Sequence, residues 1–253
     1  EALRIANRLV GNSADAAALE ITMGGFRART STDVWIAATG AMAPLHIGGV
    51  AADPGTAHLW RAGEELAFDT PAHGVRTYLA LRGGLASSRE AGSRSSDLMS
   101  GLGSAPLTAG SLIPLGAEVA GPIPVVESPP WGEPRDGEIT LYLEPGSRAD
   151  WFAPEALTAL YDAIWTVTAD ANRSGIRLDG PELERIVTGE LPSEGMVVGA
   201  LQVPPSGRPT ILLADGPVTG GYPVIAVVSD ESLDALAQAR PGTRVRFRHA
   251  VTR

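Results

Sequence analysis

Glycine and proline divide this chain into short apolar runs, and that spacing limits the folds open to it. Thirty glycines and twenty prolines are spread over 253 residues, and both residue types punctuate regular structure. Apolar runs of roughly four to eight residues between turns are typical of β-strands. The chain is 44% hydrophobic, which is too apolar for a disordered protein. We therefore predict a mainly β protein with a few short helices.

The apolar periodicity places these elements in two halves. Pro114 to Pro134 is a proline-rich stretch that opposes both helix and central strand, so we place a domain boundary in it, giving domains 1–124 and 125–253. Many short strands with few helices in each half favour paired barrels. Helices are predicted at 3–9, 154–163 and 232–239, and strands at 19–23, 33–38, 65–68, 75–82, 138–143, 164–168, 196–203, 210–214 and 224–228.

Two missing residue types exclude several chemistries. All twenty basic residues are arginine, so a Schiff base, a Walker-type phosphate loop and biotin attached to this chain are impossible. Without cysteine there is no disulfide and no thiolate nucleophile, which is compatible with a cytoplasmic location. The four histidines never have the i, i+4 spacing of helical metal ligands. We therefore expect no metal site.

The charge distribution argues against nucleic acid as a partner. The net charge is −9, whereas duplex binding needs a dense positive field. Arg244, Arg246 and Arg248 alternate with apolar residues, and we interpret them as the solvated face of a terminal strand. No apolar run approaches the roughly 20 residues that span a bilayer. We predict neither nucleic-acid nor membrane binding.

The segment from Glu190 to Ile225 carries most of the predicted site. Its polar residues stand beside glycines and prolines, which can hold a side chain at a set angle. A carboxylate on a tight turn can serve as a general base, and an amide offers both a donor and an acceptor. The alternative is that these turns only make bends. We favour a site formed by Ser193, Glu194, Gln202, Asp215, Thr219 and Tyr222.

Two further loops combine arginine with hydrogen-bonding side chains. Arg94 could grip a carboxylate or phosphate while Asp97 orients it, or Asp97 could cap the short helical turn that starts at Leu98. Asn172 and Arg173 could present amide and guanidinium groups to a planar ligand, or Asn172 could satisfy a turn. We include all four residues, with Arg94, Glu194 and Asp215 as the catalytic candidates.

Several long motifs resemble the allophanate hydrolase subunit 2 family, also described as biotin-dependent carboxyltransferase-like and as the C subunit of 5-oxoprolinase. Besides Glu190 to Ile225, the matching segments are RIANRLVGN at 4–12, LEITMGG at 19–25, YLALRGG at 78–84, GSRSSDLMSGLG at 92–103, RADWF at 148–152 and NRSGIRLDG at 172–180.

The resemblance implies two cyclophilin-like β-barrel domains, a leader ahead of Glu1, and subunit 1 of the same family as a partner. It also implies a small amide or ureido substrate, with ATP bound at this chain or with the partner subunit. In the leading hypothesis the complex hydrolyses a C–N bond, as in opening 5-oxoproline. One alternative is carboxyl transfer to urea or a similar amide from carboxybiotin on another chain. The other is a non-catalytic partner or regulator of subunit 1.

Overall fold

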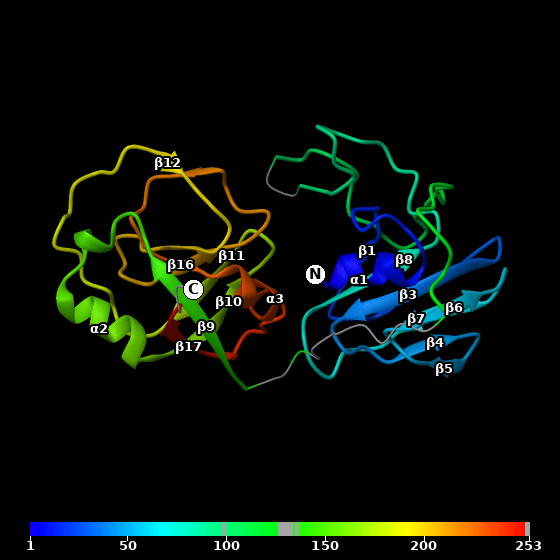
Figure 1. Cartoon of the computed structure of the whole chain (residues 1–253), viewed down its shortest axis with the longest axis horizontal. Helices are drawn as coiled ribbons and strands as arrows, with labels where there is room; N and C mark the ends of the chain where they lie inside the picture. Colours follow the sequence, from blue (N-terminus) through cyan, green and yellow to red (C-terminus); the bar gives the residue numbers. More distant parts are fainter. Residues whose placement is uncertain (98–99, 126–133, 135–136, 251–253) are drawn as a thin grey trace. The chain divides into compact units, whose positions relative to one another are not determined.

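The computed structural model describes residues 1–97, 100–125, 134 and 137–250. The chain separates into two compact units, Glu1–Pro134 and Arg135–Arg253 (Figure 1). The predicted boundary at 124/125 lies ten residues ahead of this division, within the same proline-rich stretch. Within the described part of the chain, no helix is long and apolar enough to cross a lipid bilayer.

The first unit holds two four-stranded sheets around one core. One sheet has the order β1-β8-β3-β6 and the other β2-β7-β4-β5. Both contribute buried side chains to the same cluster, for example Ile36 from β3 and Phe68 from β7. Apolar residues from facing sheets therefore bury one another. The strands are β1 Leu19–Thr22, β2 Phe26–Arg29, β3 Val34–Gly40, β4 Leu45–Ile47, β5 Val50–Ala52, β6 Ala57–Trp60, β7 Glu65–Phe68 and β8 Arg76–Leu81.

Helix α1 (Ala2–Leu9) is fixed to this unit by buried asparagines. The Asn12 side chain donates to the Leu81 carbonyl at 2.8 Å and accepts from the Gly83 N–H at 2.9 Å. It also donates to Asn7 Oδ1 at 3.1 Å. Buried polar groups are costly unless they are paired, and these pairs join the helix end to β8. The RIANRLVGN motif therefore has a structural role.

The second unit is a closed barrel with the strand order β10-β11-β14-β13-β16-β9-β17. Its core contains Trp165 and Phe247, both fully buried, together with Leu160 of α2 and Leu236 of α3. The two helices thus contribute apolar faces to the barrel core. The elements are β9 Glu138–Pro145, η1 Ala149–Trp151, α2 Pro154–Asp162, β10 Ile164–Ala171, β11 Gly175–Asp179, β12 Glu194–Gly195, β13 Ala200–Gln202, β14 Thr210–Leu212, β15 Thr219–Gly220, β16 Val224–Val228, α3 Asp230–Ala237 and β17 Arg244–His249.

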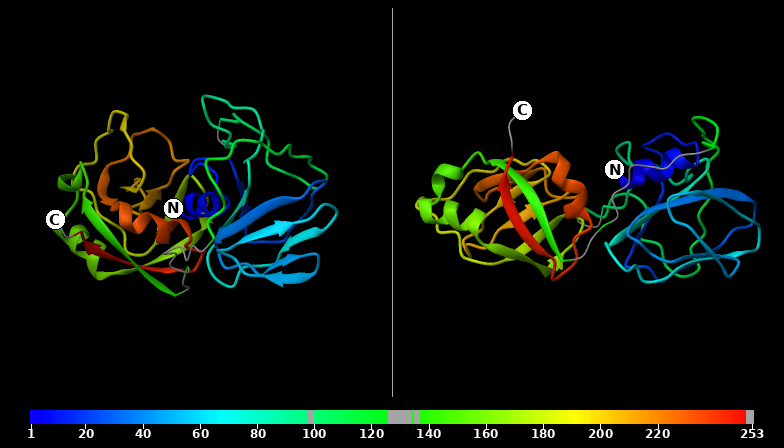
Figure 2. Two further views of the ribbon diagram at one scale, coloured as in Figure 1. Left: turned by 45° about the vertical axis from the view of Figure 1, so that its right-hand side comes forward. Right: turned by 60° about the horizontal axis from the view of Figure 1, so that its bottom comes forward.

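The last strand, β17, closes the barrel between β9 and β10. It runs parallel to β9 from Arg244↔Glu138 to His249↔Leu143 and antiparallel to β10, as Figures 1 and 2 show. Alternation along the strand buries Val245 and Phe247, and Arg246 Nε donates to Glu138 Oε1 at 2.8 Å. The alternating arginines therefore follow from strand geometry.

The prediction of a mainly β chain with a few short helices is confirmed, but several boundaries differ. A single strand over 196–203 is wrong, because only Ala200–Gln202 joins the barrel while Met196 packs on its outer surface. Four strands of the first unit, β2, β4, β5 and β6, were not predicted. Of these, β4 and β5 are only three residues long, too short to show a clear alternating pattern.

The Glu138 ion pair should make barrel stability depend on acidity. The hydrogen bond from Arg246 holds the pKa of the Glu138 carboxyl below its ordinary value. A lowered folded-state pKa contributes stability above the unfolded-state pKa, and this is lost as pH falls through the folded-state pKa. Glu138→Gln should therefore lower Tm at neutral pH, and its deficit should shrink in acid. Melting curves of Glu144→Gln, exposed on the same strand, provide the control; a Glu138→Gln deficit independent of pH would contradict the prediction.

Gly180 should be needed for packing against the buried indole. A Cβ at Gly180 would lie 2.5 Å from Trp165 Cε3, whereas a Cβ at Gly189 would meet nothing within 4 Å. Because overpacking a core costs about 1–3 kcal/mol, Gly180→Ala should lower the free energy of unfolding by that amount. Gly189→Ala is the matched control. Denaturant titration followed by tryptophan fluorescence measures both, and equal stabilities would refute the expectation.

Candidate functional site

The predicted site residues are divided between the two units. Arg94 and Asp97 belong to the first unit, and the other eight belong to the second. Two hollows of the first unit, of about 370 and 340 Å³, are lined by none of the ten. The candidate site therefore consists of contacts within the second unit, and the Arg94 loop is a separate group in the first.

The Arg94 loop is held by its own hydrogen bonds. Arg94 Nη1 donates to the Ser87 carbonyl. Asp97 Oδ1 accepts from the Ser100 N–H at 3.4 Å, and Asp97 Oδ2 accepts from the Ser100 hydroxyl at 2.7 Å. These contacts fit the capping interpretation of Asp97, although Leu98 and Met99 lie outside the described residues. A binding role for Arg94 and Asp97 stays a prediction.

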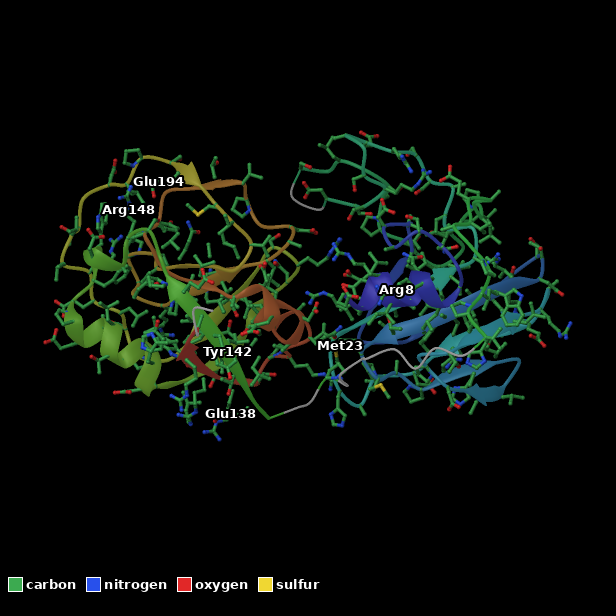
Figure 3. The ribbon with its side chains drawn as sticks, viewed as in Figure 1. Arg8, Met23, Glu138, Tyr142, Arg148 and Glu194 are labelled. Atoms are coloured by element: carbon green, nitrogen blue, oxygen red, sulfur yellow. The ribbon has the colours of Figure 1, made fainter. Side chains whose placement is uncertain are left out.

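Glu194 is paired with Arg148, a residue that was not predicted for the site. Glu194 lies on β12, which pairs with β15 in the register Glu194↔Gly220. Arg148 follows β9, and its Nη2 donates to Glu194 Oε1; Figure 3 shows the two side chains together. The guanidinium carbon of Arg148 also lies 5.8 Å from the centre of the Trp151 ring, within cation–π range.

Gln202 lies next to the antiparallel β12–β15 strand pair, against Gly220. Its side chain is on the barrel strand β13 and the residue is only 6% exposed. Nε2 donates to the Tyr222 carbonyl at 3.3 Å and contacts Met196 Sδ at 3.2 Å. No hydrogen bond occupies Oε1 among the described residues. Gln202 therefore keeps one acceptor open to a ligand N–H.

Asp215 is paired with Arg173. The Arg173 Nε to Asp215 Oδ2 distance is 3.1 Å, and the Asp215 N–H donates to the Arg173 carbonyl at 3.2 Å. This pair joins the β10–β11 loop to the chain after β14. Next to it, Asn172 Oδ1 accepts from the N–H groups of Ser174 and Gly175 at 2.8 and 3.1 Å, as a turn-forming asparagine does.

Three hydroxyl groups complete the predicted set. Ser193, Thr219 and Tyr222 are exposed, and Tyr222 has 47% of its surface accessible. Ser193 precedes β12, Thr219 is the first residue of β15, and Tyr222 follows β15 by two residues. Exposed hydroxyl groups at this position can reach a small polar ligand.

The structure brings together Arg148, Glu194, Thr219, Gln202 and Tyr222 around the β12–β15 strand pair, and separately Arg173 with Asp215. Arg148 was not among the predicted site residues. The sequence feature that could have indicated it is its position just after a strand and three residues before Trp151. Its partner lies 46 residues away. Among the described residues, no three His, Asp or Glu side chains could hold a metal ion.

A family model described as "Carboxyltransferase domain, subdomain A and B" matches residues 1–249. The chain therefore belongs to this carboxyltransferase domain A and B family, which confirms the resemblance found in the sequence.

Several named proteins and solved structures are similar to this chain over almost its whole length. It is 36% identical to the C subunit of 5-oxoprolinase from Escherichia coli over 97% of this chain and 79% of the relative. The corresponding protein of Haemophilus influenzae is 32% identical with the same coverages. The crystal structure of the K. lactis urea amidolyase gives a TM-score of 0.90 at 25% identity, covering 99% of this chain and 16% of that one. Another solved structure is 39% identical with a TM-score of 0.85, and the match covers 98% of this chain and 48% of that one.

Gly220 should set the position of Gln202. A Cβ at Gly220 would lie 2.5 Å from Gln202 Nε2, whereas a Cβ at Gly195, on the paired strand, would meet nothing within 4 Å. Gly220→Ala should therefore displace the Gln202 carboxamide and break its bond to the Tyr222 carbonyl. The side-chain amide resonances of Gln202 should move in ¹H–¹⁵N NMR spectra of Gly220→Ala. They should stay in place in Gly195→Ala; similar shifts in both variants would disprove this packing role.

Proposed function

We propose that this chain is the C-type member of a heteromeric 5-oxoprolinase-type complex that hydrolyses the C–N bond of a small cyclic amide with the use of ATP. The observation that carries the proposal is the match, over 97% of the chain, to the C subunits of two bacterial 5-oxoprolinases. The cluster around the β12–β15 strand pair supplies suitable chemistry, because it combines a carboxylate, an arginine and an open amide oxygen.

The proposed roles divide between proton transfer and positioning. Glu194 or Asp215 accepts the proton of the attacking water, since a general base must lie within hydrogen-bond reach of that water. Gln202, Thr219 and Tyr222 orient the amide, and Ser193 lines the same ligand, whereas the Asn172 oxygen serves its own turn. Arg173 in the second unit binds a carboxylate or phosphate group, and Arg94 with Asp97 offers a separate site of the same chemistry in the first unit.

ATP is proposed to act with the partner, subunit 1. This chain has no lysine, so phosphate groups on it would be held by arginine side chains or backbone N–H groups. In this proposal the partner activates the amide with ATP, and this chain binds and orients the amide and supplies the proton acceptor.

Carboxyl transfer is the second candidate function. The name of the matching family model and the relationship to urea amidolyase, 28% identical in Lachancea kluyveri, favour it. Here the biotin would be carried by another chain, and Glu194 or Asp215 would take a proton from the amide that receives the carboxyl group. This reaction uses carboxybiotin and no ATP at this step, so the two candidates differ in their co-substrate.

Replacing the catalytic carboxylate should slow turnover strongly and leave the complex assembled. With subunit 1 and the remaining component supplied, the full-length protein should release glutamate from 5-oxoproline only when ATP is present. Because general bases contribute roughly 10²–10⁴-fold to rate, Glu194→Gln or Asp215→Asn should lower kcat by that factor, whichever residue is the base. Size-exclusion chromatography measures assembly.

The controls separate the three candidate functions. No glutamate release from a well-folded complex would refute the proposal, and carboxylation of urea by carboxybiotin would favour the second function. A non-catalytic partner would be indicated if these variants lose the complex but show no further loss of activity in the complex that does form. The variants are Arg94→Ala, Arg173→Ala and Glu194→Ala. Glu190→Gln, exposed and four residues from Glu194, should leave kcat unchanged.

A further inference from the structure

We propose that the Arg148–Glu194 ion pair is a latch that a substrate carboxylate displaces. The substrate carboxylate takes the place of Glu194 on the Arg148 guanidinium, and the released Glu194 becomes available as a proton acceptor. This inference rests on the proposed function and narrows its substrate to small amides that carry a carboxylate.

The first observation is that Glu194 accepts from only one of two neighbouring N–H donors on the Arg148 guanidinium. Nε–H and one Nη2–H of a guanidinium point in the same direction and match the two oxygens of a carboxylate. In this structure Nη2 donates to Glu194, while Nε is buried and has no hydrogen-bond partner among the described residues. A buried donor without an acceptor costs free energy. A ligand carboxylate that engages both donors would remove that cost.

The second observation is that the two partners are anchored differently. The Arg148 N–H donates to the Val224 carbonyl at 3.0 Å, and the Arg148 carbonyl accepts from the Trp151 N–H at 3.0 Å. Glu194, in contrast, lies on a two-residue ladder, and the β12–β15 pair forms a sheet of its own outside the barrel ladder (Figure 1). Short isolated strand pairs are only marginally stable. Arg148 is therefore the fixed partner and Glu194 the movable one.

The third observation concerns space and access. The Arg148 side chain is 34% exposed and that of Glu194 is 27% exposed, so a ligand can reach the ion pair from solvent, and the buried Nε has to become accessible as Glu194 moves away. Figure 3 shows both labelled side chains in the second unit near β12. Trp151 keeps the guanidinium against an aromatic face, which favours a cation when Glu194 leaves.

The neighbouring groups fit an amide on the same ligand. Gln202 Oε1 is an open acceptor, and Tyr222 is exposed beside it. A cyclic amide with a carboxylate could then place its carboxylate on Arg148 and its amide N–H on Gln202. A neutral ureido compound cannot displace Glu194 in this way, because the guanidinium would exchange a charged acceptor for an uncharged one.

The test compares ligands that differ by one carboxylate. Isothermal titration calorimetry of the full-length complex without ATP would measure Kd for 5-oxoproline and for 2-pyrrolidinone, the same ring without a carboxylate. The wild type should bind 5-oxoproline at least about tenfold more tightly, as expected for a charge-assisted contact. Glu194→Gln, which weakens the competing acceptor, should bind 5-oxoproline severalfold more tightly than the wild type.

Changes at Arg148 test the other half of the latch. Arg148→Met should lose the preference for the carboxylate, and Arg148→Lys, which keeps the charge but not the paired donors, should lose most of it. Glu190→Gln should match the wild type, and thermal melting shows whether each variant is folded. An unchanged preference in folded Arg148→Lys, no tighter binding by Glu194→Gln, or no binding by the wild type would each overturn the latch.

The latch and the proposed function can fail separately. Glutamate release that does not depend on Arg148 would refute the latch and leave the proposed function standing. Arg148-dependent binding of 5-oxoproline without any ATP-dependent hydrolysis would refute the proposed function and retain the latch.

Discussion

The parallel pairing of β9 and β17 is the contact on which the second unit depends. The two strands lie more than a hundred residues apart in sequence, with Arg246 bonded to Glu138 across 108 positions, yet they close the barrel as neighbours. Closing such a long loop costs chain entropy, which the buried Phe247 and Val245 help to offset. Because Arg148 follows β9 directly, this closure also fixes the guanidinium of the candidate site.

Sequence reasoning recovered the elements with strong local signals. Pro154 at the first turn of α2 and the apolar run Val224–Val228 gave boundaries within a residue of the structure. The short strands β4 and β5 carry too few residues for a periodic signal, and parallel closure by β17 has no local signature at all. Pairing partners are set by burial across the whole unit, so the sequence could indicate two β-rich halves but not the strand order.

In the candidate site, too, residues marked by neighbouring glycines could be predicted, whereas a residue marked only by a distant partner could not. Glycine-rich turns singled out Glu194, Gln202 and Tyr222, and Gly220 does lie where a side chain would strike Gln202. Arg148 escaped notice because an ion pair across 46 residues leaves no spacing pattern. Asn172 illustrates the opposite case: its oxygen is used by the adjacent turn, so a residue type that suits a ligand can serve the backbone instead.

Closure by β17 also bears on how the protein is made in the cell. A ribosome delivers the chain from its N-terminal end, and domains generally fold as they emerge. The first unit has its own core and can form early. The barrel cannot, because β9 and β10 stay without their shared neighbour until Arg244–His249 has been synthesised. During that interval their open edges are exposed to chaperones and to other nascent chains.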